Sequence, residues 1–482
     1  MNAISFGTRN YPRLGVSLTP LIILIVLLPG VIIARGAEAV AGIGPWILLL
    51  CSAISLALAL AGRTLTRRGL VTGFRRSAGQ ILPAVPILIC IALVATTWMT
   101  SGVVPSLICY GLDIISPRLF LMLACAVSAA ISVLTGSSWT TIATIGVAFM
   151  GIGQVLGYSD GWIAGAVISG AYFGDKISPL SDTTVVASSA AGVDLFRHIR
   201  YLMVTTIPSI AIALAVYLCV GMFGDVTSAT HTVEMEAVLR NNFNITPLVL
   251  IVPVATIALI LLRVPTLKVL LLAALMGAVA TFIFQGQLIA DAASSALWLW
   301  RGFSLSTGNA SLDSLVATGG VTGMASTIFL VLCAMTFGAV MIGTGMLGRI
   351  TQAFTTSLRK RTSIVGATVG SGLAMNCLTA DQYLSLIITG NMYRALYRRF
   401  GLEARLLSRS MEDAVSVTSV LIPWNSCGVT QSTVLGVSTL IYFPYCIFNI
   451  LSPLMSVLIA WVGYKIPAPA ASLAASTPAS PS

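Results

Sequence analysis

Charged side chains are scarce in this chain of 482 residues. Only 9% of the residues are Asp, Glu, Lys or Arg, whereas soluble proteins carry about 25%. Apolar residues make up 57%. So few charges cannot cover a soluble enzyme, nor a soluble domain with a single membrane anchor. The composition therefore predicts an all-α polytopic membrane protein, with a length that allows about ten to thirteen crossings.

Residues that form metal sites and disulfides are also scarce. The chain has two histidines and nine cysteines, and no two cysteines form a CxxC pair. Most of the cysteines lie inside apolar runs, where they are typical of small buried side chains. We therefore expect no cofactor and no metal site beyond that of a transported ion. No nucleotide-binding motif is present, which indicates an ion gradient as the energy source.

The excess of positive charge lies between the apolar runs. The chain carries 26 Lys and Arg against 15 Asp and Glu, and its basic clusters fall at 63–76, 197–200, 349–361 and 394–405. Basic residues next to membrane spans mark the cytoplasmic side. This explains the charge without a nucleic acid as partner, and it predicts a multi-pass protein with these clusters on the cytoplasmic side of its membrane.

Two apolar stretches are interrupted by polar residues near their middle. The stretch 119–157 breaks at 135–138, and 363–391 breaks at 376–379. If the second stretch folds back, the arginines of 394–409 stay on the cytoplasmic side. Each stretch is followed by an interrupted span (162–192, 405–435) and a plain span (201–222, 436–463). This order predicts an inverted-repeat ion-transporter fold with re-entrant hairpins and broken helices.

The predicted repeat divides the chain into five regions. These are the N-terminal spans with a basic cytoplasmic loop (1–78), the first transport repeat (79–222), a connecting region with spans and interfacial segments (223–320), the second, inverted transport repeat (321–466) and a disordered Pro/Ala/Ser-rich tail (467–482).

Several carboxylates occur inside or at the breaks of the apolar segments, where an unpaired charge costs several kcal/mol. The densest polar run is 174–184, GDKISPLSDTT, in which Pro179 disrupts the helix and frees backbone carbonyls. Carboxylates, hydroxyls and carbonyls are hard oxygen ligands that suit sodium. The candidate ion- or substrate-binding residues of this run are Asp175, Ser178, Asp182, Thr183 and Thr184.

Three further breaks supply similar side chains. Pro423 interrupts the second broken span as Pro179 interrupts the first. We predict that the four breaks converge on one site near the membrane midplane. Its remaining candidate residues are Ser137, Ser138, Thr140, Asn376, Asp381, Glu412, Asp413, Thr418 and Asn425.

These segments carry a family resemblance. The run 174–184 resembles the signature of the NhaC-type sodium/proton antiporter family, as do 135–141, 379–383 (TADQY) and 421–425 (LIPWN). The similarity extends from about residue 80 to 463. The resemblance implies an ion-transporter fold built from inverted repeats and a multi-pass protein of the bacterial cytoplasmic (inner) membrane. The family includes sodium/proton exchangers and a malate/lactate exchanger coupled to sodium and protons.

The expected function is secondary active exchange of sodium for protons by alternating access. A buried carboxylate binds either a proton or a sodium ion, and binding of one disfavours binding of the other, so the two cations compete for one site. Asp182 is the first choice for the competing group, and Asp413 or Asp175 the second. Replacing Asp182 by Asn is expected to abolish sodium-dependent proton movement.

Other interpretations of the same residues stay open. Asp175 and Lys176 can form a neutral structural pair, Arg409 can pair with Glu412 or Asp413, and Asp381 can cap a helix. The serines and threonines can bond back to their own helices.

Other functions also stay open. The chain can exchange or cotransport a small carboxylate, such as malate or lactate, or an amino acid. A passive channel is a weaker alternative, because paired hairpins indicate a gated protein with two states. An intramembrane aspartyl protease is weaker still, because a protease of that class needs Gly at residue 172, which is Tyr. We expect the chain to be no enzyme. Its expected partners are sodium, protons and the lipid bilayer, with an organic anion or amino acid and a homodimer left open.

Overall fold

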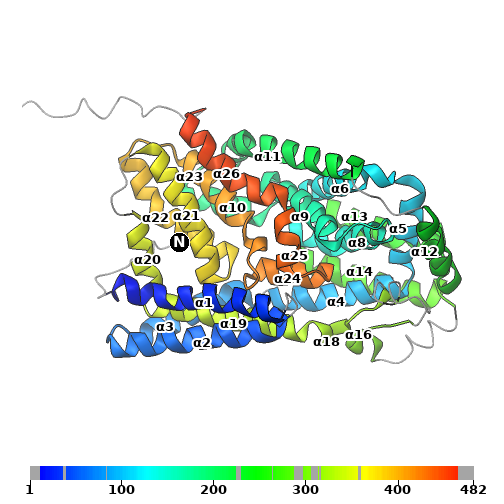
Figure 1. The fold of residues 1–482 in the computed structure, drawn as a ribbon, viewed down its shortest axis with the longest axis horizontal. Helices are drawn as coiled ribbons and strands as arrows, with labels where there is room; N and C mark the ends of the chain where they lie inside the picture. Colours follow the sequence, from blue (N-terminus) through cyan, green and yellow to red (C-terminus); the bar gives the residue numbers. More distant parts are fainter. Residues whose placement is uncertain are drawn as a thin grey trace, which may run out of the picture.

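The structure is a computed structural model that describes residues 11–35, 39–82, 84–223, 229–262, 264–286, 297–305, 313, 316–355 and 360–464. Every regular element in these residues is helical. Within these described ranges, six helices are long and apolar enough to cross a membrane, and up to nine spans result if each of three bent helix pairs is one span. Most helices run along the long axis of the molecule (Figure 1). The chain is a multi-pass helical membrane protein.

The N-terminal part forms five helices. They are α1 (Leu14–Arg35), α2 (Ala39–Ala61), α3 (Arg67–Ile81), α4 (Ala84–Thr100) and α5 (Val103–Ile114). The axes of α4 and α5 differ by 65°. The basic segment that we expected to be a loop is helical from Arg67, because Thr66 caps α3 and the helix packs closely on α19 (Ala325–Gly343). A Cβ on Gly73 would lie 2.3 Å from the carbonyl oxygen of Ala339, so only glycine allows this approach.

The first predicted hairpin and broken span are present. The elements are η1 (Pro117–Leu119), α6 (Phe120–Thr135), α7 (Ser138–Thr141), the π-helical turn η2 (Ile142–Gly146), α8 (Val147–Val155), α9 (Asp160–Ile177), α10 (Asp182–Ala191) and α11 (Leu195–Phe223). The chain reverses after Thr135 through Gly136, which adopts a φ of 67°, a conformation that glycine adopts without strain. Pro179 lies in the break between α9 and α10, as predicted.

The connecting region is described in part. It contains α12 (Ala229–Asn242), η3 (Pro247–Leu250), α13 (Ile251–Leu261), α14 (Thr266–Phe284), α16 (Trp298–Arg301) and α18 (Gly320–Gly323), and it leads into α19 and α20 (Met346–Thr355). Most of the predicted interfacial segment 286–320 and the predicted disordered tail 467–482 lie outside the described residues.

The second hairpin and broken span follow in a similar order. The elements are α21 (Arg361–Thr379), α22 (Gln382–Arg399), α23 (Ala404–Met411), the π-helical turn η4 (Glu412–Ser416), η5 (Ser419–Leu421), α24 (Ser426–Leu435), α25 (Thr439–Tyr442), η6 (Phe443–Tyr445) and α26 (Ile447–Val462). The reversal lies at Ala380, which has a φ of 56°, just beyond the predicted break at 376–379. Pro423 lies between η5 and α24, as predicted.

The two hairpins extend toward opposite ends of the molecule. In Figure 1, α21 and α22 lie on the left, α6 and α8 lie on the right, and α10 and α24 lie near the middle. Buried apolar side chains form three clusters around these elements, the largest of which joins α4, α5, α6, α8, α9 and α11. The reversals of both hairpins are therefore placed near the centre of the long axis.

The first hairpin packs very closely on the broken span. A Cβ on Gly170 of α9 would lie 2.0 Å from the carbonyl oxygen of Cys125 in α6, and one on Gly174 would lie 2.4 Å from the carbonyl oxygen of Ala129. The two glycines are four residues apart, so they lie on the same face of α9. This spacing of small residues is typical of closely packed membrane helices.

We expect Gly170→Ala to destabilise the protein. The added methyl group meets the backbone of α6, which cannot move aside, and overpacking of this kind costs about 1–3 kcal/mol. The melting temperature in detergent, followed by tryptophan fluorescence, should therefore fall. The matched control is Gly366→Ala in α21, where a Cβ meets nothing within 4 Å, and its melting temperature should not fall. Equal melting temperatures for the two variants would contradict this packing.

Candidate cation site

A cleft of about 800 Å³ lies where the two hairpins and the first broken span meet. Its walls come from three of the four predicted breaks and from the turn between α13 and α14. The lining residues with polar side chains are Thr135, Ser137, Thr140, Asp175, Asp182, Thr183, Thr266 and Gln382. The α13–α14 turn thus lines the same cleft as the hairpins.

Asp175 belongs to the last turn of α9. Its side chain lies beside the N-terminus of α7, where the second arm of the first hairpin begins. Its Oδ2 accepts hydrogen bonds from the backbone nitrogen (3.1 Å) and the Oγ (2.7 Å) of Ser138, the first residue of α7. The side chain of Asp175 is almost completely buried, although it lines the cleft. These hydrogen bonds and the positive end of the helix dipole offset part of the cost of burying a carboxylate charge.

Asp182 is the first residue of α10 and lines the same cleft, but it is exposed. Ser181 caps α10, and its Oγ hydrogen-bonds with Thr183 Oγ1 (2.9 Å). Thr184 Oγ1 donates to the carbonyl oxygens of Lys176 (3.1 Å) and Asp175 (3.4 Å). The carbonyls that the break was expected to leave free are thus partly satisfied by a hydroxyl from the following helix.

The serines near the first hairpin have structural contacts of their own. Ser178 Oγ donates to the carbonyl oxygen of Val133 (2.8 Å), which fastens the break to α6. Ser137 caps α7 and accepts hydrogen bonds from the backbone nitrogen (3.2 Å) and the Oγ1 (3.1 Å) of Thr140. Ser137 and Thr140 line the cleft, whereas Ser138 is turned toward Asp175.

Asp381 occupies the corresponding place in the second hairpin. It caps α22, and its Oδ1 accepts a hydrogen bond from the backbone nitrogen of Leu384 (2.8 Å). Its Oδ2 lies 3.5 Å from Ser426 Oγ. Each hairpin therefore has an aspartate at the N-terminus of its second arm, supplied by α9 in the first hairpin and by the hairpin itself in the second. The capping interpretation of Asp381 is confirmed.

The fourth break, which interrupts the second broken span around Pro423, packs against the backbone of the second hairpin. None of its residues lines the cleft. Asn376 Nδ2 donates to the carbonyl oxygen of Val415 (2.7 Å) and to Thr418 Oγ1 (3.2 Å), and Asn425 Nδ2 donates to the carbonyl oxygen of Asn376 (3.1 Å). Asn376, Thr418 and Asn425 are thus brought together, but against the hairpin backbone. Three breaks, not four, meet at the cleft.

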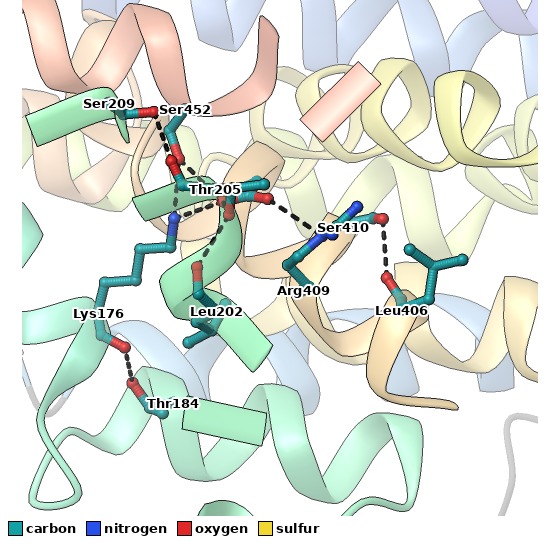
Figure 2. A network of polar contacts seen from close by, with 10 residues as sticks. Lys176, Thr184, Leu202, Thr205, Ser209, Leu406, Arg409, Ser410 and Ser452 are labelled. Carbon is teal, nitrogen blue, oxygen red and sulfur yellow. Dashed lines mark hydrogen bonds and ion pairs between the residues drawn. The ribbon is translucent and has the colours of Figure 1, made fainter. Parts of the chain in front are cut away.

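Lys176 pairs with Asp413, not with its neighbour Asp175. Figure 2 shows Lys176, Thr205, Ser452 and Arg409 around one centre. Lys176 Nζ forms an ion pair with Asp413 Oδ1, and both side chains are fully buried. Adjacent residues on a helix point about 100° apart, so Asp175 faces the cleft while Lys176 faces the second half of the chain. The pairing of Asp175 with Lys176 is therefore wrong.

Further groups complete this buried network. Ser452 Oγ and Thr205 Oγ1 donate to Asp413 Oδ1 at 2.9 Å and 3.1 Å. Arg409 Nε lies 3.9 Å from Asp413 Oδ2, and Arg409 is fully buried. The predicted pairing of Arg409 with the acidic pair thus holds for Asp413. The sequence analysis missed Thr205 and Ser452; the available signal was a lysine within an apolar helix, which requires a buried acid and polar partners.

Glu412 lies next to this network without joining it. The residue is fully buried in η4, and neither of its carboxyl oxygens has a hydrogen-bond partner among the described residues. The side chains of Thr183 and Ser416 approach it without hydrogen-bond geometry. A π-helical turn such as η4 is often found at functional sites. An unpaired carboxyl group in this position is stable only when it holds a proton or a cation.

Comparison with known proteins places the chain among ion antiporters. The model of the Na+/H+ antiporter family matches residues 10–204 and 170–464. The Na(+)/H(+) antiporter NhaC of Alkalihalophilus pseudofirmus is 39% identical over 79% of this chain and 82% of its own length. The Malate-2H(+)/Na(+)-lactate antiporter of Bacillus subtilis is 35% identical over 79% and 81%.

Another relative covers nearly the whole chain. The arginine/ornithine antiporter ArcD of Halobacterium salinarum is 33% identical over 96% of this chain and 94% of its own length. The solved structure of Neisseria gonorrhoeae MtrF covers 94% of this chain and 96% of its own, with 14% identity and a TM-score of 0.37. This structural similarity is too low to support a conclusion about the fold.

Proposed function

Because the chain belongs to the Na+/H+ antiporter family, with NhaC-type relatives, we propose that it exchanges sodium for protons across a bacterial cytoplasmic membrane. It is a secondary antiporter and not an enzyme. The observation that carries the proposal is the cleft in which Asp175 and Asp182 lie beside the hydroxyls of Ser137 and Thr140. These oxygens are the hard ligands that sodium prefers.

The proposed mechanism is competition of the two cations for Asp175. A carboxylate that is 8% exposed has little water to stabilise its charge, so binding of either a proton or a sodium ion is favourable. One carboxylate oxygen accepts both hydrogen bonds from Ser138. Alternate exposure of the cleft to the two sides of the membrane then exchanges one cation for the other, without ATP.

Asp175 is a better candidate for the competing group than Asp182, our first choice from sequence. Asp182 is exposed, so water already stabilises its charge. We propose that Asp182 attracts cations into the cleft instead. Asp413 is occupied by Lys176 and does not line the cleft, which makes it a structural partner. Glu412 is a second candidate carrier of a proton.

We further propose that regions 79–222 and 321–466 are inverted repeats that move relative to other elements during transport. In support, α6 to α11 follow the order of hairpin, broken span and final span that α21 to α26 also follow. The hairpins extend toward opposite ends of the molecule (Figure 1). A homodimer stays a prediction.

One observation favours a second candidate function, the exchange of a small organic substrate together with the cations. A cleft of about 800 Å³ is much larger than a bare sodium ion requires and falls within the usual range for small-molecule sites. Relatives named for malate, lactate, arginine and ornithine agree with this alternative.

The proposed function is tested in everted membrane vesicles that carry the protein. A pH gradient is established, and sodium, lithium, malate, lactate, arginine and ornithine are added in turn. Sodium alone should dissipate the gradient, and the organic compounds should have no effect of their own. If sodium has no effect unless an organic compound is present, the second candidate function replaces the first.

A further inference from the structure

A second cavity, of about 350 Å³, lies between the first turns of α11 and α23, outside the network and the cleft described above. It is lined by Arg197, Arg200, Tyr201, Val204 and Arg405. Three of its five lining side chains are thus guanidinium groups. Arginine is well suited to phosphate because its planar group donates two parallel hydrogen bonds to two oxygens.

The charge of this arginine pocket is only partly balanced. Arg405 forms an ion pair with Glu403. Arg197 and Arg200 are exposed, and neither forms an ion pair with a described residue. Asp194 is the other nearby acid, and it accepts a hydrogen bond from the backbone nitrogen of Arg197 (3.1 Å). Two guanidinium groups therefore stay available for an anion, at the N-terminal end of a long helix where the dipole also favours negative charge.

The surface next to the arginine pocket is apolar. Helix α26 runs antiparallel to α11, since Tyr217 Oη donates to the carbonyl oxygen of Tyr445 while Thr205 and Ser452 share Asp413. Tyr201 consequently packs in one apolar cluster with the C-terminal half of α26. Exposed apolar side chains lie along these two helices: Ile207, Leu454, Leu458, Trp461 and Val462.

We propose that the arginine pocket binds the phosphate of an anionic phospholipid whose acyl chains lie on the exposed apolar face of α11 and α26. The charge of the pocket and the apolar face beside it match the two parts of one such molecule. Basic pockets between membrane helices on the cytoplasmic side hold lipid headgroups in this way, and 197–200 is one of the basic clusters that predict that side. An exposed tryptophan, Trp461, is typical of the membrane interface.

The pocket is also in contact with the buried network. The guanidinium groups of Arg405 and Arg409 both lie 4.9 Å from the centre of the Tyr201 ring. Arg405 lines the pocket. Arg409 lies beside Asp413, which is the ion-pair partner of Lys176. A phosphate held by Arg197 and Arg200 of α11, in a pocket that Arg405 of α23 also lines, therefore stabilises the packing of α23 on α11. Lipid binding should consequently raise the stability of the folded protein.

The test measures thermal unfolding of the purified, delipidated full chain in neutral detergent. Phosphatidylglycerol, phosphatidylcholine or inorganic phosphate is titrated in, and the concentration that gives half of the maximal rise in melting temperature is compared. The proposal expects phosphatidylglycerol to stabilise the wild type at the lowest concentration. The double variant Arg197→Gln/Arg200→Gln should need about 25-fold more lipid, since each of the two arginines contributes on the order of fivefold in affinity.

The matched control is Arg398→Gln/Arg399→Gln, which removes the same charge from two exposed arginines at the end of α22. It should respond to phosphatidylglycerol as the wild type does. Equal responses of the pocket variant and the control would overturn the proposal. So would equal stabilisation by phosphatidylcholine, which would indicate an apolar effect, or by inorganic phosphate, which would indicate a site for the free anion. None of these readouts depends on sodium/proton exchange.

Discussion

Replacement of Asp175 by asparagine is expected to abolish sodium-dependent proton exchange. Asparagine retains an oxygen that can accept the hydrogen bonds of Ser138, so the hairpin and α9 should keep their arrangement. The amide of asparagine carries no charge and takes up or releases no proton near neutral pH, so it should bind neither a proton nor a sodium ion. Loss of a charge-assisted contact of about 3 kcal/mol corresponds to about a hundredfold weaker binding of sodium.

The measurement is the sodium-induced rise of fluorescence of a pH-sensitive dye in everted vesicles, with the amount of protein in the membrane determined in parallel. Asp182→Asn should weaken the response to sodium and leave it detectable, because that side chain is exposed. Asp113→Asn, which alters an exposed acid outside the cleft, is the control and should exchange normally. Normal exchange by the Asp175 variant would refute its assignment as the competing group.

Replacement of Lys176 by methionine is expected to destabilise the protein more than any other single change discussed above. It removes the partner of a fully buried carboxylate, and breaking such a pair costs about 3–5 kcal/mol because an uncompensated charge is left behind. Arg409 Nε, 3.9 Å from the other oxygen of Asp413, is too distant for a hydrogen bond and compensates only in part. The melting temperature in detergent should fall steeply.

The double variant Lys176→Met/Asp413→Asn distinguishes charge from packing. It removes both charges and keeps an oxygen that accepts hydrogen bonds from Thr205 and Ser452. Part of the lost stability should therefore return, and the remainder stays lost because Asp413 is also the carboxylate next to the buried Arg409. If the double variant is as unstable as Lys176→Met alone, Lys176 stabilises the fold through its packing and not through the ion pair with Asp413.

The breaks in the helices could be predicted from local chemistry, and the partners across the molecule could not. Pro179 and Pro423 each interrupt a helix because of their own covalent structure, and the polar turn at Gly136 is equally local. The contact of Lys176 with Asp413 depends instead on how two segments 237 residues apart pack. A neighbouring opposite charge in sequence, Asp175, suggested the wrong partner because helix geometry separates adjacent side chains.

The cleft shows the same division between local and long-range information. Asp175, Asp182, Ser137 and Thr140 were singled out by their polarity within apolar runs, and the cleft contains them. The turn between α13 and α14 also lines it, although no polar signal in 264–266 distinguishes that turn from an ordinary loop. The position of Asn425 behind the second hairpin likewise follows from packing, since its amide reaches the backbone of Asn376.

The close contact at Gly170 and Gly174 has a consequence for how ions would cross. With no side chain between α6 and α9 at these positions, we expect the first hairpin and the helix that carries Asp175 to move as one rigid block. The oxygens of Ser137, Thr140 and Asp175 would then keep their arrangement through each transport cycle. We therefore expect the path of the cation to be opened by motion at the α13–α14 turn, which lines the cleft and lies outside this block.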